Sequence, residues 1–194
     1  MKATMMLLFV LTPAISCSET KAPTSAAPKP AAAHGPSSPA GELHFQAPNG
    51  WSSETPASSM RKAQYKLPRA EGDMEDGELV VFYFGEGQGG SVEANVQRWI
   101  GQFKKADGSP AGDVARRKTK EVRGIKVTIV DVSGTYTGGG PMMSSGDPKP
   151  SYRMLAAVAE TRGGPWFVKL TGPTRTVTRW EPGFQEFLDS MRYE

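Results

Sequence analysis

The sequence predicts an α+β fold over residues 42–194, with a largely antiparallel sheet and two helices packed on it. Three features of the sequence indicate this fold. Apolar runs of strand length are joined by connections short enough for hairpins. Two further stretches carry apolar residues at helical spacing. The segments also follow one another as three strands, a helix, four strands and a helix, which is not the regular strand–helix alternation of a parallel sheet.

Three strands are predicted before the first helix. Residues 43–47, LHFQA, alternate between apolar and polar side chains and stop at a Pro-Asn-Gly turn. Residues 60–67 form the second predicted strand. The third, 79–84, reads LVVFYF. A continuously apolar strand is typical of the centre of a sheet that is covered on both faces.

The first helix is predicted over 91–103, after the glycine-rich segment FGEGQGG. Ser91 is the expected N-cap, because a serine hydroxyl accepts a hydrogen bond from a free amide of the first turn. Glu93 lies in that turn, where a negative charge is favourable. The apolar face of this helix consists of Val92, Val96, Trp99, Ile100 and Phe103.

Four strands and a second helix complete the predicted domain. Strands over 113–122 and 124–136 are joined by a turn, and a hairpin follows over 152–161 and 166–171. The final helix is expected to begin near Pro182, because proline is tolerated in a first helical turn. A separate helical turn over 174–180 is an additional option. The apolar face of the final helix consists of Phe184, Phe187, Leu188 and Met191.

The N-terminus has the three parts of a signal peptide over residues 1–16. Lys2 supplies a positive charge, MMLLFVL is an apolar core too short to span a bilayer, and AIS places small residues before a cut. Cys17, the single cysteine of the chain, would follow that cut directly. With one cysteine, no intrachain disulfide can form.

Residues 11–17, LTPAISC, resemble the signal of bacterial lipoproteins, in which the cysteine after the cut is acylated, palmitate among its acyl chains, and becomes the first residue. The resemblance implies that Cys17 is the lipidation site and that the exported chain is anchored to a membrane. Ser18 in the next position resembles the pattern sent to the outer membrane or cell surface rather than kept at the inner membrane. Ala14 and Pro13 depart from the family pattern, and the same residues suit an ordinary signal peptidase, so a secreted soluble protein is the alternative.

Residues 17–41 are predicted to be the anchored cysteine followed by a linker rich in Ala, Pro and Ser. No apolar side chain larger than Ala or Pro occurs over 18–41. Such a segment cannot bury enough surface to offset its conformational entropy, so we expect it to be disordered. Whatever the protein binds must then be bound by the folded domain, 42–194.

The charge of the chain gives little indication of a polyanionic partner. Lys and Arg number 23 and Asp and Glu 20, which is nearly balanced, and the basic run RRKTK at 116–120 is expected to be a solvated strand face. A nucleic-acid-binding domain normally carries a clear basic footprint. We therefore expect no nucleic-acid partner.

Residues 85–90 match G-x-G-x-x-G between a strand and a helix, the local context of a dinucleotide site. The following segments are predicted to be antiparallel, and no acidic residue ends a second parallel strand, so the full motif is missing. The remaining interpretation is a glycine-rich turn. Its amides at Gly89, Gly90 and Ser91 could hold an anion at the helix N-terminus.

No catalytic residue, metal site or cofactor is predicted. His44 is the one histidine in the domain, and zinc needs further strong ligands. The acidic stretch 71–78 lacks the spacing of a calcium loop and is expected to be a solvated hairpin tip. A pair of carboxylates brought together by the fold would escape detection in the sequence.

The order of segments and several local features resemble the PsbP-like superfamily, which includes DcrB-like bacterial lipoproteins. The shared features are a Gly-Trp turn at 50–51, a Tyr-Arg pair at 152–153, the WFV strand at 166–168 and the closing aromatic helix. The resemblance implies a PsbP-like fold and an accessory or binding role, without a family catalytic motif.

We therefore expect a membrane-anchored accessory or binding lipoprotein of the bacterial cell envelope, without catalysis. Its partners would be the membrane, through the lipid, and an envelope protein, for which the loop 138–151 is the best contact segment. The alternatives are a carboxylate-based envelope enzyme, or anion or nucleotide binding at the turn Gly85–Ser91.

Overall fold

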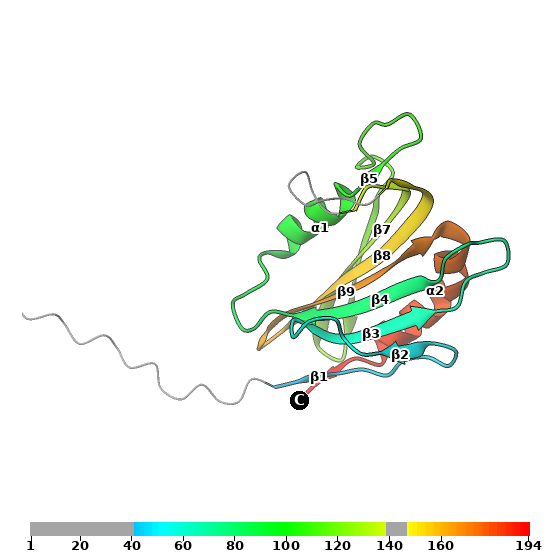
Figure 1. Cartoon of the computed structure of the whole chain (residues 1–194). Coiled ribbons are helices and arrows are strands. Elements are labelled where there is room, and N and C mark those ends of the chain that lie inside the picture. Colours follow the sequence, from blue (N-terminus) through cyan, green and yellow to red (C-terminus); the bar gives the residue numbers. More distant parts are fainter. Residues whose placement is uncertain (1–40, 139–146) are drawn as a thin grey trace, which may run out of the picture. The chain divides into compact units, whose positions relative to one another are not determined.

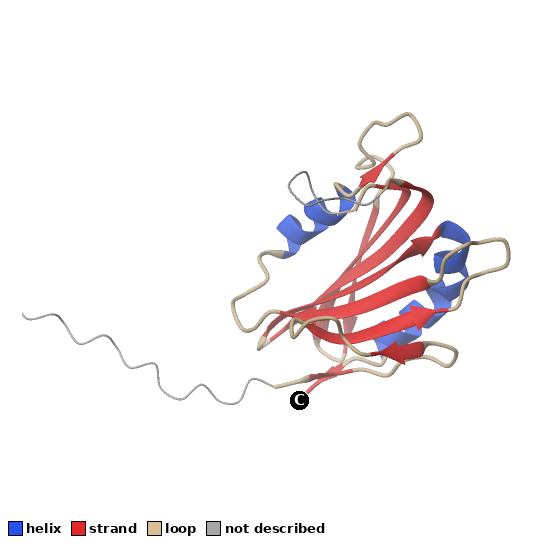
Figure 2. Cartoon of the chain, viewed as in Figure 1, coloured by secondary structure: helices blue, strands red, loops and turns tan. Residues whose placement is uncertain are grey.

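The computed structural model describes residues 41–138 and 147–194. The strands in them are β1 (Leu43–His44), β2 (Ser52–Glu54), β3 (Arg61–Leu67), β4 (Gly77–Tyr83), β5 (Phe103–Lys104), β6 (Arg116–Val122), β7 (Ile125–Tyr136), β8 (Lys149–Thr161), β9 (Gly164–Pro173) and β10 (Arg192–Tyr193), and the helices are α1 (Val92–Ile100) and α2 (Thr174–Asp189). Eight strands form one antiparallel sheet in the order β2-β3-β4-β9-β8-β7, with β5 and β6 both paired to β7. One helix lies on each face of this sheet, which confirms the predicted α+β class (Figures 1 and 2).

The sheet separates two hydrophobic cores. On one face, Phe184 and Phe187 of α2 pack against the larger core. On the other, Trp99 of α1 meets Phe167 of β9 edge to face, with ring centroids 6.2 Å apart. β4 contributes Leu79 and Val81 to the larger core and packs Phe82 against the other, which confirms its predicted central position, although its α1 face is covered only in part because Glu78 is half exposed.

Helix α1 forms where its periodicity predicts it, although it ends at Ile100 rather than at residue 103. Ser91 is the N-cap, and its hydroxyl accepts a hydrogen bond from the amide of Ala94 at 3.2 Å. Phe103 instead begins β5, which pairs with the end of β7. The predicted helix was too long because the apolar spacing continues into β5, whose paired residues in β7 lie 31 and 33 positions further along the chain.

Helix α2 begins earlier in the chain than predicted. It is one helix over Thr174–Asp189 with Pro182 in its interior, so the expected start near Pro182 was wrong. Its N-terminus is stabilised from outside, since the Asp73 carboxylate accepts hydrogen bonds from the Thr176 amide at 2.8 Å and the Thr176 hydroxyl at 2.6 Å. A cap supplied by a residue about 100 positions away leaves no local signal in the sequence.

Four short strands were not predicted as the structure has them. Residues 43–47 give only the two residues of β1, which pair with β10 in a separate two-stranded sheet. The backbones of Glu42 and Glu194 extend this pairing, each amide donating to the carbonyl of the other at 2.7 and 3.2 Å. The sequence did not indicate β2, β5 or β10.

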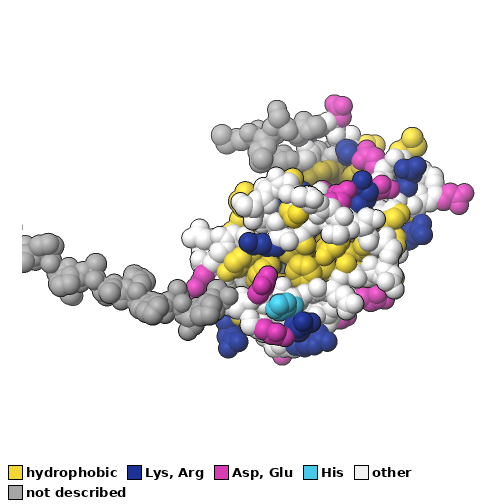
Figure 3. All heavy atoms as spheres, turned by 60° about the horizontal axis from the view of Figure 1, so that its bottom comes forward, with side chains coloured by type: hydrophobic (Ala, Val, Ile, Leu, Met, Phe, Trp, Pro, Cys, Tyr) yellow, Lys and Arg dark blue, Asp and Glu magenta, His cyan; other side chains and the backbone are white. Residues whose placement is uncertain are grey.

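The face that carries His44 has acidic and basic side chains side by side, with hydrophobic side chains next to them (Figure 3). His44 itself lies 4.0 Å from the Glu194 carboxylate. Among the described residues, no helix combines the length and apolar character needed to cross a membrane.

Candidate functional site

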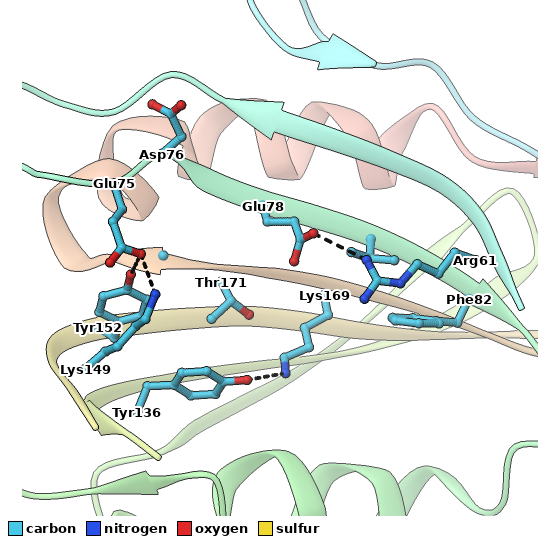
Figure 4. A pocket seen from close by; sticks show the side chains of 12 residues that line it. Arg61, Glu75, Asp76, Glu78, Phe82, Tyr136, Lys149, Tyr152, Lys169 and Thr171 are labelled. Atoms are coloured by element: carbon cyan, nitrogen blue, oxygen red, sulfur yellow. Dashed lines mark hydrogen bonds and ion pairs between the residues drawn. The ribbon is translucent and has the colours of Figure 1, made fainter. Parts of the chain in front are cut away.

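The α1 face of the sheet carries a cavity of about 320 Å³, which we call the Lys169 cavity (Figure 4). Strands β3, β4, β7, β8 and β9 and the loop before β4 contribute to it. Its lining residues are Arg61, Glu75, Asp76, Glu78, Val80, Phe82, Tyr136, Lys149, Tyr152, Lys169, Thr171 and Gly172.

Alternation along β9 places Lys169 in this cavity. Its strand neighbours Val168 and Leu170 belong to the α2 core, so the lysine side chain extends from the opposite face. The residues paired with it on the adjacent strands are Val80 and Ala156, which are both short. The small neighbours leave space above the sheet that the lysine side chain enters.

The Lys169 ammonium has neutral hydrogen-bond partners. Its Nζ donates to Gln102 Oε1 at 2.8 Å and lies 3.3 Å from the Tyr136 hydroxyl, and it also sits 5.2 Å from the centre of the Tyr136 ring. Burial lowers the pKa of Lys169 to about 8; the Glu78 charge acts against this shift, and the charges of Arg98 and Arg61 add to it. No carboxylate within the described ranges lies within ion-pair distance of this amine.

The other charges of the cavity lie on its rim and are paired. Arg61 contacts Glu78 at 3.4 Å, and Lys149 contacts Glu75 at 2.5 Å. About half of each Glu side chain is exposed, 50% for Glu78 and 52% for Glu75. The hydrogen bond from Lys149 is the main cause that lowers the pKa of Glu75 below its ordinary value, and the hydrogen bond from Tyr152 lowers it further. These carboxylates are therefore solvated acceptors, not desolvated acids.

Two tyrosines form the β7–β8 wall of the cavity. The rings of Tyr136 and Tyr152 are stacked, with centroids 6.1 Å apart and an angle of 9° between their planes. Burial raises the pKa of both phenols above the ordinary value of 10.0, so both remain protonated and able to donate near neutral pH. This wall offers aromatic surface with a hydroxyl at each ring.

A second hollow, of about 460 Å³, lies on the α2 face between β6 and α2. Arg153 lines it, but the charge of this residue is compensated. Its guanidinium contacts both carboxylate oxygens of Asp131, at 2.9 and 3.0 Å, and a Glu181 oxygen at 2.8 Å. The network joins β7, β8 and α2, which indicates a structural role.

The predicted anion-binding residues Gly89, Gly90 and Ser91 lie at the start of α1, as expected. Gly89 has a positive φ of +88°, and a Cβ there would stand 2.6 Å from the Phe167 ring, so close packing requires glycine. The Asn95 side chain donates to the carbonyls of Gly89 and Ser91 at 2.8 and 2.9 Å. These contacts give the segment a structural role, and anion binding by its amides stays a prediction.

The predicted lipidation site Cys17, the signal peptide and the linker up to residue 40 lie outside the described residues. Residues 139–146, which make up most of the expected partner-contact loop 138–151, also lie outside the described residues. Both interpretations remain predictions.

The acidic stretch 71–78 was expected to be a solvated hairpin tip, but three of its carboxylates make contacts within the fold. Asp73 caps α2, Glu75 pairs with Lys149, and Asp76 accepts the Arg69 amide at 2.9 Å. No cluster of three metal-ligating side chains occurs in the part of the chain that the structure describes.

Sequence reasoning missed Lys169, although one signal for it was present. Residues 166–170 read WFVKL, and strict alternation puts the lysine on the same face as the buried Phe167. A charge at a position where a strand predicts an apolar residue is a reason to look for a site.

No family model matches the chain, and no curated protein matches it in sequence. Several solved structures are similar to it, among them the following two. A protein of unknown function from Pseudomonas aeruginosa is 12% identical, with a TM-score of 0.45, over 72% of this chain and 94% of that one. Cyanobacterial PsbP (CyanoP) from Synechocystis sp. PCC 6803 is 12% identical, with a TM-score of 0.46, over 82% of this chain and 96% of that one. A PsbP protein is thus among the structural neighbours, and the likeness concerns the fold alone.

Proposed function

We propose that this chain is a lipid-anchored accessory protein of the bacterial cell envelope whose folded domain binds a small ligand in the Lys169 cavity. One observation carries the binding proposal: the half-buried Lys169 amine extends into an open cavity and has neutral partners only among the described residues. Burying a charge without a counter-charge costs stability, so packing alone does not favour a lysine at this position. A ligand that enters the cavity would supply the missing interactions.

The rim carboxylates favour binding over the alternative of a carboxylate-based enzyme. A carboxylic acid that donates a proton near neutral pH needs a raised pKa, which enzymes obtain by desolvation. Glu75 is half exposed and its pKa is lowered. It is therefore suited to hold Lys149 in place and poorly suited to transfer a proton to a substrate.

A cavity-filling variant tests the binding proposal. Ligands would first be found by screening the full chain carrying Cys17→Ser, which removes the acceptor thiol, against a library of neutral, cationic and anionic small molecules. Thr171→Phe adds a ring inside the cavity, whereas the matched control Thr55→Phe adds the same ring at an exposed position after β2, outside it. We expect Thr171→Phe to weaken binding about tenfold or more, and the control to leave it unchanged.

The proposal fails if no member of the library binds, or if the ligands found bind the Thr171→Phe variant as tightly as the parent chain. Ligand-observed NMR detects whether a library member binds, and calorimetry compares its affinity for the variant and for the parent chain.

The anchoring proposal rests on Cys17 and is tested separately, in cells. Cys17→Ser should move the protein from the membrane fraction to the soluble fraction of the envelope, because the acyl chains contribute about 0.8 kcal/mol per buried methylene. Equal retention of the variant in membranes would overturn the lipid anchor while leaving the ligand-binding proposal intact.

A further inference from the structure

We infer that the ligand of the Lys169 cavity is a monocarboxylate with an apolar or aromatic body, and that its carboxylate binds between the Lys169 ammonium and the Tyr136 hydroxyl. This inference rests on the proposed function and specifies the chemical class of the ligand. Three properties of the cavity support it: its charge balance, its free donors and its aromatic walls.

The charge balance leaves one positive group inside. The two rim pairs, Arg61 with Glu78 and Lys149 with Glu75, each sum to zero. Asp76 points away from the lysine, and its carboxylate accepts the Arg69 amide (Figure 4). Lys169 is thus the one cation of the cavity without an ion-pair partner among the described residues, and a single carboxylate would supply that partner.

The available donors converge on one position. A lysine ammonium has three N–H donors, and Lys169 uses two of them on Gln102 Oε1 and the Tyr136 oxygen. The third has no acceptor among the described residues. Because the Tyr136 oxygen accepts from Lys169, its own O–H is left to donate, and Figure 4 shows the two groups meeting inside the cavity. An N–H and an O–H from adjacent groups suit the two oxygens of a carboxylate.

The walls define the rest of the ligand. Val80, Phe82 and the stacked Tyr136 and Tyr152 supply apolar and aromatic surface beside the donors, while Arg61 lies over the Phe82 ring at 5.7 Å and Lys149 over the Tyr152 ring at 5.4 Å. A volume of about 320 Å³ is at the small end of ligand sites, where a single ring or a short acyl chain fits. Phosphate or sulfate alone would leave this surface uncovered.

Binding of a carboxylate should also take up a proton. The pKa of Lys169 is about 8 in the free protein, and a bound anion would raise it by replacing the missing counter-charge. At pH 8 the uptake should be on the order of half a proton per ligand, measured by calorimetry in two buffers of different ionisation enthalpy. The titratable and charged groups that face Lys169 or line the same cavity are Arg61 of β3, Glu78 of β4, Arg98 of α1, Tyr136 of β7, Lys149 and Tyr152 of β8, and Glu75 and Asp76 of the loop before β4.

The test pairs each carboxylate with its neutral amide. Acetate, octanoate, benzoate and indole-3-acetate, and the four corresponding amides, would be titrated into the full chain carrying Cys17→Ser at pH 7. We expect at least one carboxylate to bind about tenfold or more tightly than its amide. Lys169→Met should remove this preference, while Lys118→Met, an exposed lysine of β6, should keep it.

Tyr136→Phe provides a second variant, in case Lys169→Met fails to fold. It removes one hydroxyl and should weaken the carboxylate about three- to tenfold while changing the amide little. The inference is overturned if the amides bind as tightly as the carboxylates, if Lys169→Met keeps the preference, or if only other classes of library molecule bind. These results would leave the proposed binding function standing, whereas binding by no molecule at all would overturn both.

Discussion

A buried cation and a half-buried one, on opposite faces of one sheet, are compensated in opposite ways. Arg153 of β8 has an 11% exposed side chain and contacts carboxylates from β7 and α2. Lys169 of the adjacent strand β9 contacts an amide oxygen and a phenol. Each residue lines a hollow, so lining a hollow does not by itself distinguish a site from a structural contact.

The difference lies in where the counter-charge comes from. Hydrogen bonds that Arg153 donates to the Asp131 carboxylate raise the pKa of Arg153 above its ordinary value in spite of burial, so the folded protein stabilises its charged form. At Lys169 burial dominates and the charged form is disfavoured. The fold therefore supplies the counter-charge of Arg153, whereas Lys169 has no counter-charge within ion-pair distance among the described residues.

Removing the counter-charge of Arg153 should have the largest effect on stability. Asp131→Ala leaves a buried guanidinium with Glu181 as its remaining acid, and we expect a loss of about 3–4 kcal/mol in the free energy of unfolding. Urea unfolding at pH 7 measures it. The double variant Asp131→Ala/Arg153→Met should recover much of that loss, because it removes the unpaired charge. A loss below about 1 kcal/mol for Asp131→Ala would show that this network is not needed for the fold.

Removing the charge of Lys169 should act in the opposite direction. Lys169→Met replaces a disfavoured ammonium with an apolar side chain of similar length, so we expect a gain of about 2–3 kcal/mol at pH 7. The same urea titration measures it, with Lys118→Met as the exposed control. A clear loss of stability in Lys169→Met would mean that the ammonium contributes to the fold, as Arg153 does.

The pH dependence of this gain follows from the pKa of Lys169, which is about 8 in the folded protein and near its ordinary value of 10.5 when unfolded. Between these values the unfolded chain binds more protons, so the stability of the wild type rises with pH. The advantage of Lys169→Met should therefore be complete below pH 8 and nearly absent by pH 10.5. Parallel stability curves for the two proteins over this range would contradict the lowered pKa.

The smallest effect is expected at the rim. Lys149 and Glu75 are 2.5 Å apart, but their side chains are 45% and 52% exposed, and exposed ion pairs contribute little. Lys149→Ala should change the free energy of unfolding by less than about 1 kcal/mol. If Lys149→Ala lost as much unfolding free energy as Asp131→Ala, the loss would depend on breaking an ion pair and not on whether the pair is buried.

The parts of the fold that the sequence predicted are those with local signals. The periodicity and the Ser91 cap located α1, and hairpin-sized connections located β3, β4 and β6 to β9. The parts it missed depend on distant partners. The start of α2 depends on Asp73, and β1 and β10 exist because they pair with each other.

The candidate site divides in the same way. Alternation in WFVKL indicates a lysine on a buried face, and that much was readable from the sequence. Whether one of the 20 acidic residues of the chain lies beside it depends on the packing of β3, β4, β7 and α1 around β9. Local patterns carry no information on that packing.

Because β1 pairs with β10, the two ends of the folded domain lie side by side, and the chain could be joined there and opened elsewhere without changing the fold. Glu42 and Glu194 are hydrogen-bonded neighbours, and the loop after β5 is exposed at Gly108, where a side chain would meet nothing within 4 Å. A circular permutant that joins 194 to 42 through a short linker and opens at 108 would retain each described strand pairing. It would also offer a new attachment point beside α1, so the domain could be immobilised or labelled without using its native N-terminal connection.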